Sequence, residues 1–166
     1  MASEIRGSDN FDSSEAGKVI QMVNYQTSAV VTTTSIIPWD NTIPQITEGA
    51  EFLSISITPK SATNILIVEG VLSMTADTTN SICTKSLFLA GTSNALYTTN
   101  NYSINVNHMT AVPMRYKMVA GATTPLTFSI RAGNHTAVRT TMNGWTAAAY
   151  YGGSWTSSIQ ITEFAP

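Results

Sequence analysis

The chain has 166 residues, a formal net charge of −2 and one cysteine, and charged side chains make up 11% of it. This length favours one domain, and the lone Cys83 excludes an intramolecular disulfide framework and a multi-cysteine metal site. The weak negative charge gives no electrostatic footprint for nucleic acid. No apolar run approaches the ~18 residues of a membrane span, and the start lacks the segments of a secretory signal. We therefore expect synthesis in a cytoplasm, with neither nucleic acid nor membrane as partner.

The polar part of the composition is neutral rather than charged. The charged fraction is about half of that in a typical soluble domain, and 25 threonines stand in its place together with many serines and asparagines. Low charge weakens the repulsion between like subunits. The composition therefore permits close packing of copies of this chain.

Residues 1–17 differ from the rest of the chain. They carry four acidic side chains against Arg6, are rich in serine and glycine, and show no hydrophobic period. Such a segment has no core of its own. We expect an N-terminal arm that reaches up to ~55–60 Å when fully extended. It is either a free terminus or a tether to a partner, in which case Ile5 and Phe11 would be its anchors.

From Lys18 to the end, residues 18–166, the pattern has the period of two that β-strands show. Strands are expected over 18–25, 28–37, 53–57, 65–74, 114–118, 126–131 and 159–162. Pro38 and Pro44 make 38–49 a loop or edge, 58–64 is a turn, and Asn143-Gly144 and Gly152-Gly153 mark further turns or breaks. Eight to ten short strands without a convincing helix predict an all-β sandwich, jelly roll or barrel.

The strand within ITPKSATNILIVEGVLSMT, residues 57–75, is apolar on both faces. Leu66, Val68, Leu72 and Met74 share one face, and Ile65, Ile67 and Val71 share the other. Gly70 between them suggests a bulge or a close backbone approach. A sandwich covers one face only, so the second face needs another cover. We expect Ile65, Ile67 and Val71 to contact a neighbouring subunit or an extended arm.

The sequence shows no local signature of catalysis or of a bound cofactor. The two histidines lie 27 residues apart without metal-binding spacing, and no nucleophile elbow or phosphate-binding glycine loop occurs. Cys83 lies among apolar residues and is expected to be a buried, inert thiol. We therefore expect a protein that is not an enzyme and carries no cofactor or metal.

Aromatic residues gather in NGWTAAAYYGGSW, near the C-terminus. Trp145, Tyr150, Tyr151 and Trp155 have three interpretations: packing of the last strands, a subunit interface, or a platform on which sugar rings stack. Trp39 beside Asp40 has the same alternatives.

Several segments resemble a family of tailed-phage and prophage virion surface proteins. The most specific are DNTIPQITEG and TPKSATNILI, within a similarity that spans most of residues 17–164. The resemblance implies a jelly-roll-type antiparallel β-sandwich, generally trimeric, without enzymatic activity and located in the virion, which assembles in the host bacterial cytoplasm. It leaves the position on the particle open.

Two functional hypotheses of different class follow. The first is a homotrimeric structural protein of the virion, namely a head decoration (cement) protein that binds the major capsid protein. A variant of this hypothesis is a tail-fibre or receptor-binding knob subunit that binds a tail protein. The second is a carbohydrate-binding module that uses the aromatic cluster. One compact domain with one arm and no fibre repeats favours the decoration protein.

Overall fold

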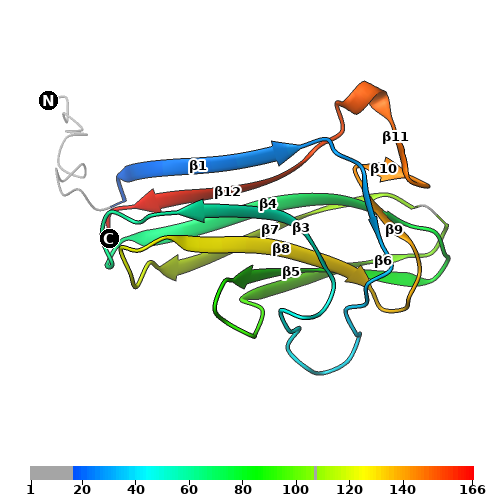
Figure 1. Cartoon of the computed structure of the whole chain (residues 1–166), viewed down its shortest axis with the longest axis horizontal. Helices are drawn as coiled ribbons and strands as arrows, with labels where there is room; N and C mark the ends of the chain where they lie inside the picture. Colours follow the sequence, from blue (N-terminus) through cyan, green and yellow to red (C-terminus); the bar gives the residue numbers. More distant parts are fainter. Residues whose placement is uncertain (1–16, 107) are drawn as a thin grey trace, which may run out of the picture.

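The computed structural model describes residues 17–106 and 108–166. Ile5 and Phe11, the expected arm anchors, lie outside the described residues. In the described part, two antiparallel sheets face each other, and β1 begins at the same end of the sandwich at which β12 ends (Figure 1). No helix in the described ranges is long and apolar enough to span a membrane.

The first sheet contains the first and last long strands of the chain. Its strands are β1 (Val19–Thr27), β12 (Ser157–Phe164), β4 (Ile65–Ala76) and β7 (Thr110–Val119), extended by the short β9 (Thr140–Met142) and β2 (Val31–Thr33). The second sheet has the order β3 (Ala50–Ile57), β8 (Leu126–Asn134), β5 (Ser81–Leu89) and β6 (Tyr97–Ser103). A separate small hairpin pairs β10 (Gly144–Trp145) with β11 (Ala148–Ala149), followed by a 3-10 turn, η1 (Tyr151–Gly153).

The connectivity is that of a jelly roll. Among the described residues eight strands have seven residues or more, and the first pairs with the eighth, the second with the seventh, the third with the sixth and the fourth with the fifth. These four pairs alternate between the two sheets. A long hairpin rolled over in this way is the jelly-roll arrangement of an antiparallel sandwich. The expected fold class is therefore confirmed.

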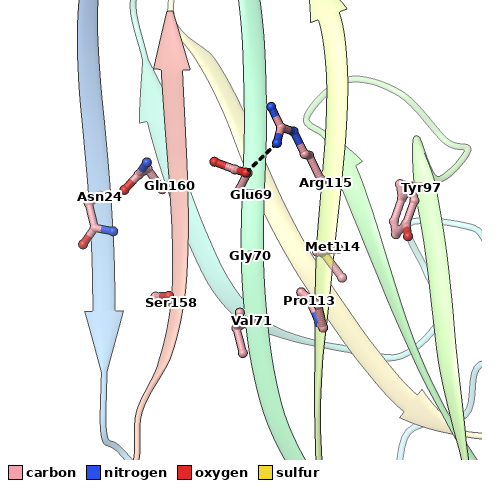
Figure 2. Close-up of a pocket in the computed structure, with 10 residues that line it drawn as sticks. All are labelled: Asn24, Glu69, Gly70, Val71, Tyr97, Pro113, Met114, Arg115, Ser158 and Gln160. Atoms are coloured by element: carbon pink, nitrogen blue, oxygen red, sulfur yellow. Dashed lines mark ion pairs between the residues drawn. The ribbon is translucent and has the colours of Figure 1, made fainter.

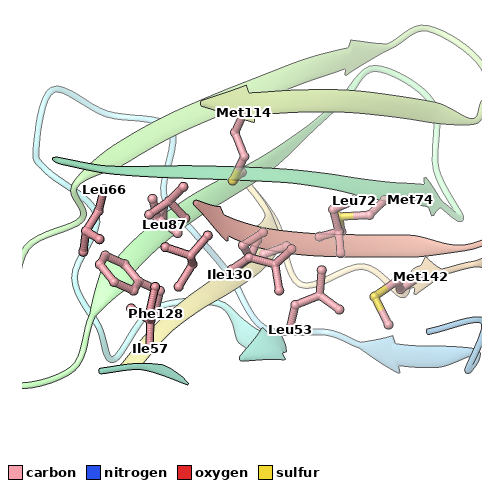
Figure 3. Packing of buried hydrophobic residues seen from close by; sticks show 14 of the residues in the cluster. Leu53, Ile57, Leu66, Leu72, Met74, Leu87, Met114, Phe128, Ile130 and Met142 are labelled. Carbon is pink, nitrogen blue, oxygen red and sulfur yellow. The ribbon is translucent and has the colours of Figure 1, made fainter. Parts of the chain in front are cut away.

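The core lies between the sheets and uses the face of β4 that the sequence predicts. Leu66, Val68, Leu72 and Met74 are buried there, against Leu53, Leu87, Phe128 and Ile130 of the second sheet (Figure 3). Period-two alternation places these residues on one side of the strand whatever its neighbours are.

Gly70 marks a close approach rather than a bulge. The pairing of β4 with both β12 and β7 runs through Gly70 without a register shift. A Cβ atom at this position would lie 2.5 Å from Cδ1 of Ile130. A side chain at position 70 would therefore fit only if the Ile130 side chain moved aside, which is the close approach that a glycine within a strand indicates.

Two expected elements differ from the structure. The strand expected over 28–37 is reduced to β2, because the segment crosses from β9 of the first sheet to Asn134 of the second, where Ile36 forms an isolated bridge. Asn143, with positive φ, forms the expected break between β9 and β10, but the hairpin turn lies further on, at Thr146 and Ala147, which both have positive φ.

Candidate functional site on the outer face of the first sheet

The register of β1, β12, β4 and β7 arranges their outward side chains in rows across the sheet. The first row, at the end where the described chain begins, contains Val19, Phe164, Ile65 and Val119. All four are apolar, and Val19 and Val119 are more than half exposed. The second row contains Met22, Thr162, Ile67 and Lys117. We call the six apolar members of these rows the terminal band: Val19, Met22, Ile65, Ile67, Val119 and Phe164.

The third row is entirely polar and bounds the terminal band. It contains Asn24, Gln160, Glu69 and Arg115, which lie side by side across four strands (Figure 2). An Arg115 Nη1 lies 3.5 Å from Glu69 Oε1. Both side chains are largely exposed, so the pair adds little stability. It does leave the row without net charge.

Beyond the polar row the outer face is hollowed. The fourth row brings Ser158, Val71 and Pro113 together, and Tyr97 of β6 lies beside them (Figure 2). With the polar row they line a shallow depression of about 470 Å³. Val71 is thus separated from Ile65 and Ile67, which the sequence grouped with it as one interface. Ile65 and Ile67 lie in the terminal band and Val71 lines the hollow, and all three are half-buried.

A buried carboxylate holds the strand ends beneath the terminal band. Glu163 is fully buried and accepts hydrogen bonds from Asn64 Nδ2 at 2.6 Å, Gln21 Nε2 at 2.5 Å and the Lys60 N–H at 2.8 Å. Burial alone would raise the pKa of Glu163, but these hydrogen bonds outweigh it and hold the pKa below its usual value. One side chain therefore ties β1, the turn before β4 and β12 into a fixed frame.

The described chain begins beside the terminal band, at Gly17. The Gly17 N–H donates to the Ala165 carbonyl at 3.0 Å, and the Ala165 N–H donates to the Lys18 carbonyl at 2.9 Å. These bonds fix the position of Gly17, the first described residue, beside the end of β12. That position lies at the end of the sheet that carries the first apolar row (Figure 1).

The aromatic residues expected near the C-terminus lie at the opposite end of the sandwich, at the hairpin β10–β11 and η1 (Figure 1). Trp145 and Tyr150 are stacked with their ring centroids 5.6 Å apart, and Tyr151 meets Trp155 edge-on at 6.0 Å. Three of them are exposed, Tyr151 at 77%. They are therefore a surface cluster rather than part of the core. The structure places this cluster and the terminal band at two ends of the molecule.

Three features of the structure escaped sequence reasoning. Val19, Met22, Val119 and Phe164 join the terminal band only through strand register. Lys85 is fully buried on the core-facing side of β5, where Nζ donates to Asn101 Oδ1 and burial lowers its pKa to about 8. The third feature is the second hollow that Trp39 lines: the sequence left packing, an interface and a sugar platform open for Trp39, but it did not indicate a hollow. For the first and third no local pattern exists; for Lys85 the signal was its place among apolar neighbours.

The described residues contain no group of three or more histidine, cysteine, aspartate or glutamate side chains that could hold a metal ion. His135 Nδ1 accepts a hydrogen bond from the Ile82 N–H at 3.1 Å, and Cys83 is buried, with its pKa raised by that burial. The His135 side chain is therefore held by a backbone hydrogen bond, and the Cys83 side chain is packed inside the domain.

Comparisons with known proteins find likeness of structure only. No family model matches the chain, and no curated protein matches it. Eiger TNF from S. frugiperda is 10% identical, with a TM-score of 0.46 over 87% of this chain and 93% of that one. VP2 in the infectious bursal disease virus subviral particle is 11% identical, with a TM-score of 0.42 over 88% of this chain and 38% of that one. A family two carbohydrate esterase from Cellvibrio japonicus is 10% identical, with a TM-score of 0.29 over 88% and 35%. This chain thus spans well under half of the latter two, and these likenesses concern the fold alone.

Proposed function

We propose that this chain is a non-enzymatic structural subunit of a phage virion, a head decoration protein that packs on the major capsid protein as a homotrimer. The observation that carries the proposal is the terminal band, an exposed apolar surface at the end of the sandwich where the described chain begins, at Gly17. The resemblance of DNTIPQITEG and TPKSATNILI to virion surface proteins supplies the phage context.

The terminal band suits a second copy of this chain as its cover. An exposed apolar patch rimmed by polar residues is typical of a protein–protein interface. Here the rim is the polar row from Asn24 to Arg115, in which Glu69 and Arg115 cancel in charge, and Lys117 is the one charged side chain among the first two rows. In a closed trimer each copy would use this surface against a different surface of its neighbour, because the contacts of a threefold ring are heterologous.

The N-terminal segment supplies the second contact. Residues 1–17 carry Glu4, Asp9, Asp12 and Glu15 against Arg6, a net side-chain charge of −3. In this proposal the segment runs along the capsid or a neighbouring copy, with Ile5 and Phe11 buried there. A chain without residues 1–17 would then remain a trimer and lose its attachment to particles.

Localisation on the particle tests the proposal. Gold-labelled antibody against the chain is applied to intact particles of the phage that encodes it, and the particles are imaged. Label spread over the heads is expected. Label at the tail tip would replace the decoration protein by a tail-fibre or receptor-binding subunit, and particles without label would contradict a virion role.

Self-association is tested separately at the terminal band. Met22→Glu places a charge in the second row, three strands away from Lys117, at a side chain that is 58% exposed in the single chain. It is expected to raise the trimer dissociation constant at least ~100-fold, since burying an unpaired charge costs several kcal/mol. Ile104→Glu is the matched control, because Ile104 is 65% exposed on the loop after β6, away from the band. Sedimentation equilibrium measures both. Equal dissociation of the two variants, or a monomeric parent, would exclude the band as the subunit interface.

The tail-fibre variant and the carbohydrate-binding module differ in what they need from the aromatic cluster. A module that binds sugar through Trp145 and Trp155 requires their free ring faces, and Trp145 is already stacked on Tyr150. Trp145→Ala should abolish glycan binding if the cluster is the site, without unfolding the protein.

A further inference from the structure

A second hollow lies on the other side of the molecule, between the loop 38–49 and the outer face of the second sheet. It encloses about 420 Å³, within the size range of small-molecule sites. Its wall on the sheet side includes Thr84 of β5 and Thr98 and Asn100 of β6. Its wall on the loop side includes Trp39 and Ile43. We call it the Trp39 hollow.

The loop that forms one wall is held in place. Pro38 and Pro44 restrict its backbone, and the Thr42 N–H donates to Asp40 Oδ1 at 2.8 Å. Two further hydrogen bonds join it to the segment before β6: Ile46 N–H to the Ser93 carbonyl at 2.8 Å, and Ala95 N–H to the Pro44 carbonyl at 2.9 Å. The hollow is therefore preformed, which lowers the entropic cost of binding.

Apolar side chains at the mouth of the hollow remain open to solvent. The exposed fraction is 71% for Trp39 and 55% for Ile43. A fixed loop that presents a tryptophan to water gains nothing for the core of this domain. An exposed indole face beside polar groups is suited to a ligand that is apolar on one face and polar around its edge.

The polar groups of the hollow are hydroxyls, one amide and one carboxylate. The residues that line it include no lysine, arginine or histidine, so no cation is available to hold a phosphate, sulfate or sialic acid. The hydroxyl and N–H of Thr42 hold the pKa of Asp40 below its usual value, so its carboxylate is an acceptor at neutral pH. Hydroxyl groups of a ligand could donate to Asp40 and accept from the Asn100 amide.

We propose that the Trp39 hollow is a binding site for a neutral saccharide, with a sugar ring face on the Trp39 indole and ring hydroxyls on Asp40 and Asn100. The site is distinct from the aromatic cluster at Trp145 and from the terminal band. It lies on the second sheet, whereas the band lies on the first. The proposal therefore does not rest on the proposed function, and a decoration protein could bind particles and saccharide at once.

The test uses the full chain and a defined set of probes. Maltotriose, cellotriose, mannotriose, lactose and N,N′,N″-triacetylchitotriose represent neutral saccharides, and 3′-sialyllactose represents an acidic one. Isothermal titration calorimetry is run with each probe at up to 10 mM. We expect at least one neutral probe to bind, and Trp39→Ala and Asp40→Asn to weaken that probe at least tenfold. Asp40→Asn keeps an oxygen acceptor for Thr42 and so preserves the loop.

Tyr151→Ala is the matched control, because it removes a similarly exposed aromatic side chain from η1, outside the hollow. It should leave binding unchanged. Circular dichroism checks folding, and Asn100→Ala replaces Trp39→Ala if that variant unfolds. The proposal is overturned if no neutral probe binds, if sialyllactose alone binds, or if Tyr151→Ala weakens binding while Trp39→Ala does not.

Discussion

Lys85 makes the stability of this domain depend on pH in an unusual direction. Burial lowers its pKa from the usual 10.5 to about 8, and Nζ donates to the neutral amide oxygen of Asn101 rather than to a carboxylate. At pH 7 the Lys85 ammonium group is therefore charged in both states, but it is buried in the folded protein and hydrated in the unfolded chain. The shift of ~2.5 pKa units corresponds to ~3 kcal/mol of lost stability.

Between pH 8 and 10.5 the unfolded chain binds a proton at Lys85 that the folded chain has released. The free energy of unfolding therefore rises with pH in this window, and the cost is fully present below pH 8. Lys85→Met keeps most of the buried stem and removes the charge. We expect the variant to be about 2–3 kcal/mol more stable than its parent at pH 7, and the difference to fall below about 1 kcal/mol at pH 10.

The assay is urea unfolding followed by tryptophan fluorescence at pH 7, 8, 9 and 10, at one protein concentration because association adds to stability. Both proteins carry Cys83→Ala, because the thiol neighbours Lys85 and titrates in the same range with the opposite effect. Other titrating groups are common to both and cancel. A difference that stays constant across pH, or a Lys85→Met variant less stable than its parent at pH 7, would refute the reasoning.

Three further changes, one of them with a control substitution at Gly91, test the frame of the fold by urea unfolding. Glu163→Gln should lower the free energy of unfolding by about 2 kcal/mol at pH 7, because the new amide group is a buried donor facing other donors. The stability of the parent should fall toward that of the variant as the pH drops below about 4.5 and through the lowered pKa of Glu163. A stability difference that does not change with pH would contradict this. Gly133→Ala should cost at least ~2 kcal/mol, since its Cβ would lie 2.6 Å from the Ser35 carbonyl oxygen. Gly91→Ala meets no atom within 4 Å and should lose only the ~1 kcal/mol of its positive φ; equal losses would argue against the close approach. Asn143→Ala removes the side-chain hydrogen bonds to the Thr27 and Ala29 carbonyls and to the Ser157 hydroxyl. A decrease of less than ~1 kcal/mol in the free energy of unfolding would show that water replaces these bonds.

The sequence alone determined what each strand does locally. In β4 the alternation assigned Leu66 and Val68 to the core, and the structure buries both. Side chains of a strand alternate between its two faces whatever lies beside it, so this assignment needs no knowledge of partners. The same rule identified Ile65 and Ile67 as outward and apolar. It could not say that Val19 and Val119 would lie in line with Ile65.

Only the tertiary structure decided the surfaces on which function depends. The terminal band and the polar row exist because residues from four strands align, and the frame beneath them joins Gln21 to Glu163 across 142 positions of sequence. The Trp39 hollow likewise needs the loop 38–49 to meet β5 and β6. Strand pairing in a jelly roll is non-local, because its first strand pairs with its last. The period of a strand therefore tells which way a side chain points, and the register of its neighbours decides what that side chain meets.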